Sequence, residues 1–169
     1  MPFDRIDRHI LTLLQSDGRI SNSELADAVG LSPSACLRRV RALEDAGVID
    51  RYVALLNQDR IGRRMDIFVE ISLNSQSNEV LTAFEQAVAQ SPEIMECYLM
   101  AGDADYMLRI AAADPTHFEH IHRDHLARLP GVSRMRSSFA IRTITRSTAF
   151  PLPAPSREQQ RDAAPGPRA

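Results

Sequence analysis

The chain has no run of apolar residues long enough to cross a membrane, and its N-terminus lacks the hydrophobic stretch of a signal peptide. Both absences predict a cytoplasmic protein with no membrane partner. Lysine is missing too, so every basic side chain is an arginine. Because alanine and proline are plentiful, we attribute the missing lysine to codon usage and give it no functional weight.

The motifs of common enzyme classes are also missing. The chain has no G-x-S-x-G nucleophile motif, no P-loop, no G-x-G-x-x-G dinucleotide fingerprint and no H-E-x-x-H zinc helix. We therefore expect neither catalysis nor a cofactor.

Candidate metal ligands are few. The two cysteines, Cys36 and Cys97, fall in different predicted elements, which argues against a disulfide or a metal pair in a reducing compartment. Cys36 is interpreted as a small buried hydrophobe, with a redox sensor as the alternative. Four of the five histidines are clustered, at His117, His120, His122 and His125. Their helical spacing spreads them around the helix, so we interpret them as a polar surface rather than a metal site.

Length and charge limit the possible architectures. A chain of 169 residues, with 44% hydrophobic and 25% charged residues, can hold one ordinary domain or two small ones. The formal net charge of −2 is unusual for a protein that binds nucleic acid. Any contact with DNA must therefore come from local clusters of arginine.

Residues 23–52 have the pattern of a helix-turn-helix, in which the second helix lies in the DNA major groove. The first helix begins at a capping box of Ser21 and Glu24. It ends at Gly30, because glycine accepts the left-handed conformation of a sharp turn. Ser32 then caps the second helix. An upstream helix over residues 4–15 completes a three-helix core.

The second helix has two distinct faces, separated by a rotation of about 100° per residue. The predicted inward face comprises Cys36, Leu37, Val40 and Leu43. The outward face comprises Ser34, Ala35, Arg38, Arg41 and Ala42, with Arg39 on its flank. Small side chains admit a helix into the groove, and guanidinium groups reach guanine edges or phosphates. We predict double-stranded DNA contacts at a pseudo-palindromic site from Ser32, Ser34, Ala35, Arg38, Arg39 and Arg41, with Arg39 on phosphate. An ordinary solvated helix is the alternative.

The periodicity changes after Tyr52. Residues 53–62 are predicted to form a connecting strand and hinge. Strands follow over 65–73, 94–101, 106–113 and 132–145, with helices over 78–90 and 116–129. The order βαββαβ predicts an α+β, ferredoxin-like domain, a four-stranded antiparallel sheet with both helices on one face. The other face then needs cover, usually from a partner chain.

These patterns predict four segments. Residues 1–50 form the helix-turn-helix DNA-binding domain, 51–63 a linker strand, and 64–150 the ferredoxin-like domain. Residues 151–169 are rich in proline and alanine, and we expect a disordered tail.

From Asp4 to about Leu152 the chain resembles the Lrp/AsnC family of bacterial transcription regulators. The resemblance rests on DRIDRHIL followed by LQSDGRISNSELADAVGLSPSACLRRVRALEDAGVI, on PEIMECYLMAGDADYMLRI with its G-x-x-D-Y signature, and on LPGVSRMRSSFAI. The details are most similar to the branch of leucine-responsive regulators and activators of branched-chain keto acid operons. The resemblance implies that residues 1–50 are a winged helix-turn-helix. It further implies homodimers that pair through the ferredoxin-like domain and assemble into octamers. It also implies small-molecule effectors, mostly amino acids, bound between dimers.

The resemblance also implies where an effector binds. The implied residues are Tyr98, Met100, Gly102, Asp103, Asp105, Tyr106, Ser137 and Ser138. Gly102 allows close approach to backbone N–H groups that receive a carboxylate, and Asp105 suits an α-ammonium group. Tyr98 and Met100 suit an apolar side chain. The alternative is that this segment is only a hairpin turn. The sequence leaves the identity of the amino acid open.

Two other functions remain as alternatives. Sirohaem decarboxylases share this architecture, and they would need convergent histidines and arginines in a cleft. A small-molecule-binding module without DNA function is the other. The arginine-bearing helix argues against both, because neither has a use for it.

Overall fold

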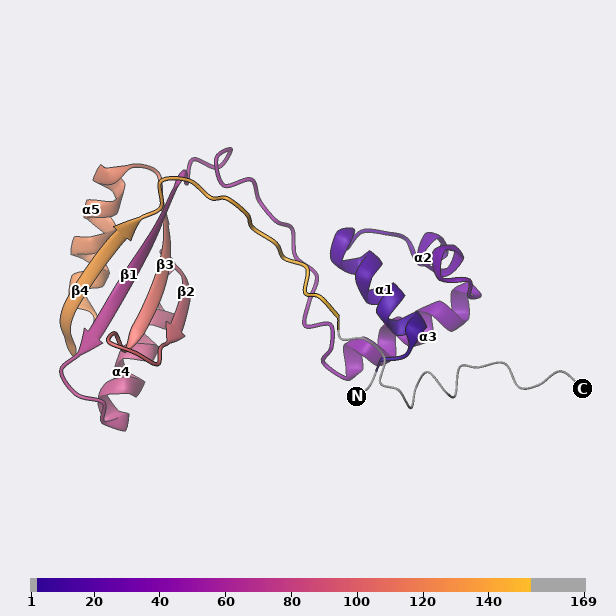
Figure 1. Cartoon of the computed structure of the whole chain (residues 1–169), viewed down its shortest axis with the longest axis horizontal. Coiled ribbons are helices and arrows are strands. Elements are labelled where there is room, and N and C mark those ends of the chain that lie inside the picture. The colour runs from indigo at the N-terminus through magenta and orange to yellow at the C-terminus, as the bar shows by residue number, and fades with distance from the viewer. Residues whose placement is uncertain (1–2, 153–169) are drawn as a thin grey trace, which may run out of the picture. The chain divides into compact units, whose positions relative to one another are not determined.

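The first three helices of the chain pack around one apolar core (Figure 1). They are α1 (Arg5–Ser16), α2 (Asn22–Val29) and α3 (Pro33–Asp45). Ile10, Leu25 and Cys36, one from each helix, are at most 2% exposed. Cys36 is therefore a buried apolar side chain, as predicted.

The turn between α2 and α3 has the geometry that its residues predict. The hydroxyl of Ser21 accepts a hydrogen bond from the Glu24 N–H at 3.2 Å, and Glu24 Oε2 accepts one from the Ser21 N–H at 3.0 Å. Gly30 ends α2 with φ at 71°, a left-handed conformation that favours glycine. The capping box and the glycine stop are confirmed.

One residue of the predicted inward face of α3 does not reach the core. Leu37 is 39% exposed, whereas Cys36 and Leu43 are buried and Val40 packs against the same cluster. Residues 36, 40 and 43 follow one stripe of the helix, and Leu37 lies about 100° from Cys36 around the axis. The prediction for Leu37 was wrong because the neighbouring helices cover only a narrow stripe of α3.

The computed structural model describes residues 3–152, which divide into two compact units. One unit runs to Ala54 and takes in the chain again from Thr145, and the other runs from Leu55 to Ile144. No helix in the described ranges is long and apolar enough to span a membrane.

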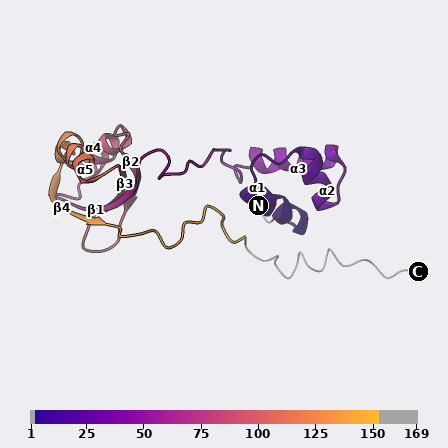
Figure 2. The ribbon, with the colours of Figure 1, turned by 90° about the horizontal axis from the view of Figure 1, so that it is seen from above.

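The second unit is a four-stranded antiparallel sheet with two α-helices on one face (Figures 1 and 2). Its elements are β1 (Met65–Leu73), α4 (Asn78–Ala89), β2 (Ile94–Leu99), β3 (Tyr106–Ala112), α5 (Pro115–Asp124), the 3-10 helix η1 (Leu126–Arg128) and β4 (Val132–Phe139). The strand order is β2-β3-β1-β4. The predicted ferredoxin-like arrangement is confirmed.

Alternation along β1 separates the two faces of this sheet. Ile67, Val69 and Ile71 are fully buried in the cluster that holds α4 and α5. Phe68 and Glu70 point to the opposite surface, which no helix of this unit covers. We call that surface the open face.

The predicted strand over residues 53–62 is absent. Residues 58–62 form turns instead, with hydrogen bonds such as Arg63 N–H to Gln58 O at 2.9 Å. Residues 53–57 lie in no helix and no sheet of the described structure. A strand needs a neighbour to pair with, and none of the described strands pairs with this segment.

Two predicted elements extend five or more residues beyond the observed ones, and the strand expected over 94–101 ends two residues earlier, at Leu99. The helix expected over 116–129 ends at Asp124, and η1 follows with the tighter hydrogen bond from Leu129 N–H to Leu126 O. The tighter turn buries both leucines before Pro130, which cannot extend a helix. The strand expected to reach residue 145 ends at Phe139, because its only partner, β1, begins at Met65.

Residues just after 144 lie with the three-helix unit. The Phe150 N–H donates to Gln15 Oε1 at 2.6 Å, and Leu152 packs against the helical core. The sequence analysis instead predicts that the ferredoxin-like domain extends to residue 150, which would include Phe150. The predicted disordered tail lies, from residue 153 onward, outside the described residues.

Candidate functional sites

The outward face of α3 carries the side chains predicted to contact DNA. Ser34, Arg38 and Arg41 are exposed, and Ala35 is half-buried. The hydroxyl of Ser32 caps the helix by accepting from the Ala35 N–H at 3.3 Å. Within the described residues, neither Arg38 nor Arg41 has an ion-pair partner. Two unpaired cations therefore stand on a face of small side chains, as a groove-binding helix requires.

Arg39 is placed differently from its two neighbours. Its Nη1 donates to Asp4 Oδ2 and to Asp7 Oδ1, each at 2.7 Å. Partial burial alone raises the pKa of the Asp4 carboxyl, but hydrogen bonds from the Asp7 N–H and from Arg39 outweigh it and lower that pKa. The side chain predicted to contact phosphate is thus already held by two carboxylates.

Charged side chains pair across the strands of the open face. Arg109 on β3 donates from Nη1 to Asp66 Oδ1 at 3.0 Å and from Nε to Glu96 Oε1 at 2.7 Å. Its hydrogen bond to Glu96 is the main cause of a raised pKa for this guanidinium. Arg136 on β4 donates from Nη2 to Glu70 Oε1 at 2.8 Å. The middle of the open face is therefore an ordered array of ion pairs.

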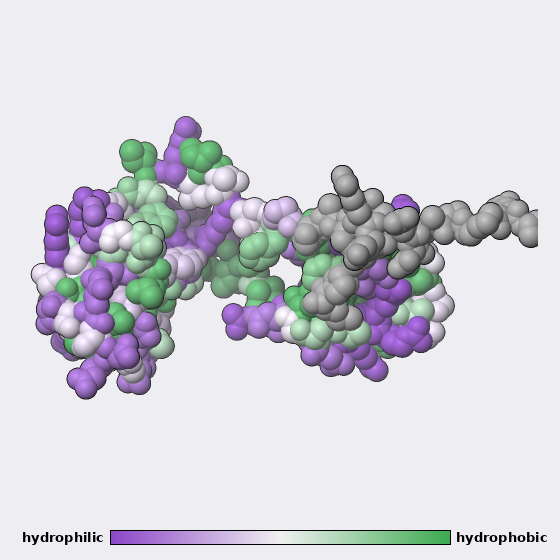
Figure 3. Space-filling model, turned by 60° about the horizontal axis from the view of Figure 1, so that its bottom comes forward, coloured by the Kyte–Doolittle hydropathy of each residue, from purple (hydrophilic) through white to green (hydrophobic). Residues whose placement is uncertain are grey.

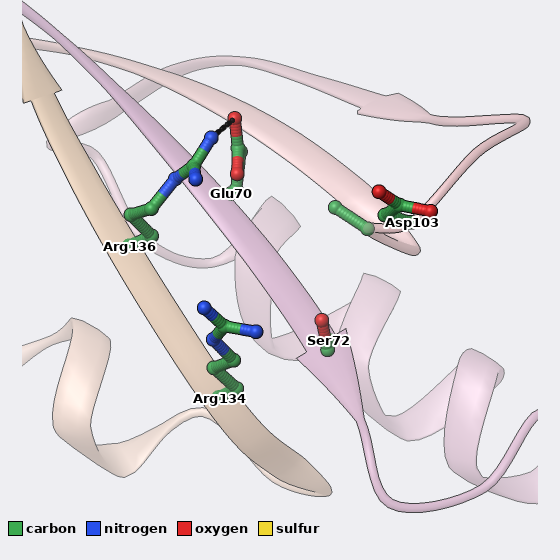
Figure 4. Close-up of a pocket in the computed structure, with 6 residues that line it drawn as sticks. Glu70, Ser72, Asp103, Arg134 and Arg136 are labelled. Carbon is green, nitrogen blue, oxygen red and sulfur yellow. Dashed lines mark hydrogen bonds and ion pairs between the residues drawn. The ribbon is translucent and has the colours of Figure 1, made fainter.

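A pocket opens on the same face, where β1 and β4 pass the loop before β3 (Figure 4). It is lined by Glu70, Ser72, Asp103, Ala104, Arg134 and Arg136. Glu70 and Arg136 pair with each other, whereas Arg134 and Asp103 make no ion pair with any described residue. The pocket therefore contains two positive and two negative side chains, and one of each sign makes no ion pair with the described residues.

Asp105, expected to bind an α-ammonium group, holds the loop to the sheet. Its Oδ2 accepts from the Leu73 N–H at 2.7 Å and its Oδ1 from Gln76 Nε2 at 2.7 Å. The Asp105 N–H also donates to Ile71 O at 2.9 Å. This carboxylate is engaged by the protein, and Asp103, two residues earlier, is the acidic side chain that lines the pocket.

Tyr106 lies on the helix side of the sheet, away from the pocket. It is 1% exposed, its ring centroid is 4.5 Å from that of Phe84, and its hydroxyl donates to Glu85 Oε1 at 2.7 Å. Ser137 pairs with the buried Val69 and so belongs to the same side. These two members of the predicted effector set do not join the others.

The remaining predicted effector residues lie on the open face or in the loop beside it. Tyr98 is 53% exposed and donates its hydroxyl to Glu96 Oε2 at 2.7 Å. Ser138 pairs with Phe68 on the open face. Met100 is exposed, and Gly102 has open space where a Cβ would point. None of these four lines the pocket itself.

Besides Ala104, sequence reasoning missed the four polar residues of the pocket that lie on strands, which are Glu70, Ser72, Arg134 and Arg136. The signal was present, because they occupy the polar positions of the alternating segments MDIFVEISL and VSRMRSSF. Alternation does not fix the register between strands. That register sets Glu70 opposite Arg136 and Ser72 opposite Arg134.

The clustered histidines do not converge. The Nδ1 of His117 accepts from the Ala113 N–H at 3.1 Å, and Arg63 Nη1 contacts the same ring. His120 and His122 are exposed elsewhere on α5. The described ranges contain no group of three or more possible metal ligands. The structure therefore gives no support to the cleft that a sirohaem decarboxylase needs.

Both units match known domain families. A winged helix-turn-helix DNA-binding model matches residues 3–50, and the Lrp/AsnC ligand binding domain matches residues 66–150. A helix-turn-helix joined to a ligand-binding domain defines a transcription regulator. The chain belongs to the Lrp/AsnC family of transcriptional regulators.

Curated relatives and solved structures agree with this membership. The chain is 45% identical to the leucine-responsive regulatory protein of Escherichia coli over 144 residues, 85% of this chain and 88% of that protein. It is 41% identical to the Bkd operon transcriptional regulator of Pseudomonas aeruginosa over 149 residues, 88% of this chain and 97% of that protein. The crystal structure of a Neisseria meningitidis regulator in complex with L-Met superposes with a TM-score of 0.83 at 36% identity, covering 88% of this chain and 96% of that one. These relatives are regulators rather than enzymes.

Proposed function

We propose that an amino acid binds in the pocket on the open face and changes how tightly α3 binds promoter DNA. The observation that carries the proposal is the pair of unpaired charges in that pocket, Arg134 and Asp103. An amino acid carries one anion and one cation on the same carbon, so it complements a site with one free charge of each sign.

Each pocket residue has a definite part in this proposal. The guanidinium of Arg134 takes the α-carboxylate, because its planar array of donors fits a carboxylate in a bidentate manner. Asp103 takes the α-ammonium, and the hydroxyl of Ser72 accepts or donates between them. The Glu70–Arg136 pair closes one side of the pocket and keeps its own charges satisfied.

The relatives support an amino acid as the ligand. The Neisseria regulator is solved with L-Met, and the Escherichia coli relative is named for its response to leucine. We extend this class of ligand to the present chain because the two pocket charges suit the part that all amino acids share.

Effector binding is tested by calorimetry with each amino acid and by DNA binding with and without the one that binds. We expect Arg134→Gln and Asp103→Asn to abolish amino acid binding while DNA binding persists. Arg123→Gln is the matched control, because Arg123 lies on α5 and pairs only with Glu119 and Asp124. Unchanged amino acid affinity in both pocket variants would refute this site.

We propose that α3 enters the major groove, with Arg38 and Arg41 reaching base edges or phosphates at a pseudo-palindromic site. Both arginines are exposed, and both lie on the face with small side chains. Arg38→Ala should weaken specific binding by about 1–3 kcal/mol if Arg38 reads a base. An anisotropy titration on specific and scrambled duplexes measures this loss. Equal losses on both duplexes would show that Arg38 contacts only the backbone.

We propose that the chain works as a homodimer or a larger assembly of dimers. No helix of the sheet unit covers the open face, and Phe68 and Tyr98 are exposed on it. Figure 3 shows apolar patches on the surface. Apolar side chains are also exposed in the segments before β1 and after β4, at Val53, Leu55, Leu56, Ile141 and Ile144. Such surfaces mark contacts with a partner chain. Light scattering on the purified protein tests this, and a monomer at micromolar concentration would contradict it.

The effector pocket and the assembly surface share the open face. An amino acid in the pocket therefore alters a surface that a second copy would cover. Binding then favours one assembly over another through differential affinity, which changes which promoter sites are occupied.

A further inference from the structure

The recognition helix α3 is tied to α1 by one arginine that looks, from its sequence neighbours, like a DNA contact. Arg38, Arg39 and Arg41 follow one another closely, and only Arg39 has protein partners among the described residues. The side chains of Arg39 and Asp7 are 32% and 15% exposed, so their contact is largely shielded from solvent.

The partners of Arg39 already have another function. Asp4 and Asp7 form the capping box of α1, in which Asp4 Oδ1 accepts from the Asp7 N–H at 2.8 Å and Asp7 Oδ2 accepts from the Asp4 N–H at 3.3 Å. This exchange uses one oxygen of each carboxylate. The second oxygen of each, Asp4 Oδ2 and Asp7 Oδ1, accepts from Arg39 Nη1 at 2.7 Å. Two carboxylate oxygens at the N-terminus of α1 thus bind one guanidinium group of α3.

The charges of this cluster are unfavourable for phosphate. Two carboxylates and one guanidinium sum to a net charge of −1, so the cluster as a whole repels DNA phosphate. Arg38 and Arg41 make no ion pair with a described residue, so no paired carboxylate offsets their attraction for DNA phosphate. The same helix therefore carries arginines in two electrostatic environments.

A second polar contact fixes the beginning of α3. The side-chain amide of Asn22, on the first turn of α2, donates from Nδ2 to Pro33 O at 2.9 Å. Pro33 is the first residue of α3, and Arg39 is six residues further along. The start of α3 is thereby tied to α2 and its middle to α1, which fixes its direction.

We propose that Arg39 is a positioning residue of the DNA-binding domain: through Asp4 and Asp7 it holds α3 at the angle at which Arg38 and Arg41 enter the groove. The inference rests on the proposed role of α3 in DNA binding. Without the contact of Arg39 with Asp4 and Asp7, α3 still packs through its apolar residues, but its angle to α1 is no longer fixed. DNA affinity then falls although no phosphate contact is removed.

The salt dependence of binding separates positioning from phosphate contact. Each phosphate contact that is lost lowers the slope of log K against log salt by about 0.9. We expect Arg39→Met in the full chain to weaken binding by about tenfold, the size of one lost charged hydrogen bond, with an unchanged slope. The probe is a duplex selected by the wild-type protein from a random pool. A slope lowered by about 0.9 for each contact would overturn the proposal, because the other guanidinium N–H groups of Arg39 would then bind phosphate.

The acidic partners give a test of opposite sign. Removing a negative charge from a DNA-binding domain ordinarily strengthens binding. Asp7→Asn keeps the capping oxygen but loses the charge that attracts Arg39, so we expect it to weaken binding severalfold. Stronger binding by Asp7→Asn would overturn the proposal, as would an Arg39→Met protein with wild-type affinity at every salt concentration.

A double-mutant cycle supplies the matched control. In the Arg39→Met protein, Asp7→Asn should weaken binding no further, because the contact between residues 7 and 39 is already lost. In the Arg41→Met protein, which keeps that contact, Asp7→Asn should weaken binding as much as it does in the wild type. Thermal unfolding of each variant establishes that the protein is folded at the assay temperature, and Asp7→Asn serves if Arg39→Met does not fold. If Arg38→Met and Arg41→Met leave binding unchanged, the proposed role of α3 fails, whatever Arg39 does.

Discussion

At the scale of single residues, two aspartates in one short loop have different roles. Asp103 is exposed at the pocket, and Asp105 accepts from the Leu73 N–H and from Gln76. Both were predicted effector residues from the sequence, although Asp105 is the aspartate of the G-x-x-D-Y signature and Asp103 occupies one of its variable positions. Only the fold shows that one carboxylate is free for a ligand and that the other fastens the loop to β1.

Substituting these two aspartates should separate stability from effector binding. Asp105→Ala leaves the partly buried Leu73 N–H without its acceptor and should lower the free energy of unfolding by about 1–3 kcal/mol. Asp103→Ala should change it by less than about 0.5 kcal/mol, as at an ordinary surface site, while abolishing amino acid binding. Denaturant unfolding and calorimetry measure the two quantities. The reverse pattern would show that the roles are exchanged.

The tyrosines should ionise at unusually high pH. Burial, and then the hydrogen bond to Glu44, raises the pKa of Tyr52 to about 12. Burial likewise raises the pKa of Tyr106, and the hydrogen bond to Glu96 raises that of Tyr98. Because the folded pKa of Tyr52 is the higher one, its contribution to stability is complete below the ordinary value of 10.0 and is lost as pH rises towards 12.

Ultraviolet absorbance follows this ionisation without interference, since the chain contains no tryptophan. We expect the titration of the folded protein to move to lower pH when the protein is denatured. Tyr52→Phe should remove one component of the folded titration, near pH 12. A folded-state midpoint at the ordinary tyrosine value for all three residues would contradict these environments.

At the scale of elements, a glycine determines how closely the start of β4 passes α4. Gly131 has φ at 74°, and a Cβ there would lie 2.6 Å from Val80 Cγ1. Gly62 has nearly the same φ, 75°, with nothing within 4 Å of its Cβ position. At Gly62 only the backbone conformation requires glycine, whereas at Gly131 both the conformation and the lack of space for a Cβ require it.

Gly131→Ala should destabilise the sheet unit more than Gly62→Ala does. The matched control carries only the cost of a left-handed alanine, about 1–2 kcal/mol. The Gly131 variant adds the displacement of Val80, typically a further 1–3 kcal/mol (about the cost of overpacking a core). Denaturant unfolding of both variants measures the difference. Equal losses would mean that the turn relaxes away from α4 freely.

Elements were predictable to the extent that their signals are local. Capping residues and periodicity predicted α1, α2, α3 and α4 closely, because those signals lie within each helix. The end of α5 was missed because Leu126 and Leu129 face the core in a 3-10 helix as they would in an α-helix. The connecting strand predicted over 53–62 does not form, because the sequence of a segment does not show whether a neighbour is present to pair with it.

The sites were less predictable than the elements, because they join distant segments. Arg39 meets Asp4 across 35 residues, and no local pattern marks that contact. The pocket joins β1 to β4 across 66 residues at the Glu70–Arg136 pair. The exposed arginines of α3 could be predicted, because a helical face is a local property.

At the scale of the whole molecule, the chain combines a DNA-binding unit and a ligand-binding unit, each with a core of its own. Their joint regulation requires communication, which the shared use of the open face for ligand and partner provides in our proposal. The formal net charge of −2 makes the outward face of α3 the local source of attraction for DNA.

The measurement that tests this account most directly is an anisotropy titration of the wild-type protein on its own upstream promoter DNA. It is made at near-physiological salt, with and without a mixture of the standard amino acids. We predict specific binding whose affinity or stoichiometry changes when the mixture is present, and a loss of that change, but not of binding, in Arg134→Gln. Specific binding that no amino acid changes would contradict the proposed amino acid sensing. The absence of specific binding would contradict the role of the protein as a DNA-binding regulator.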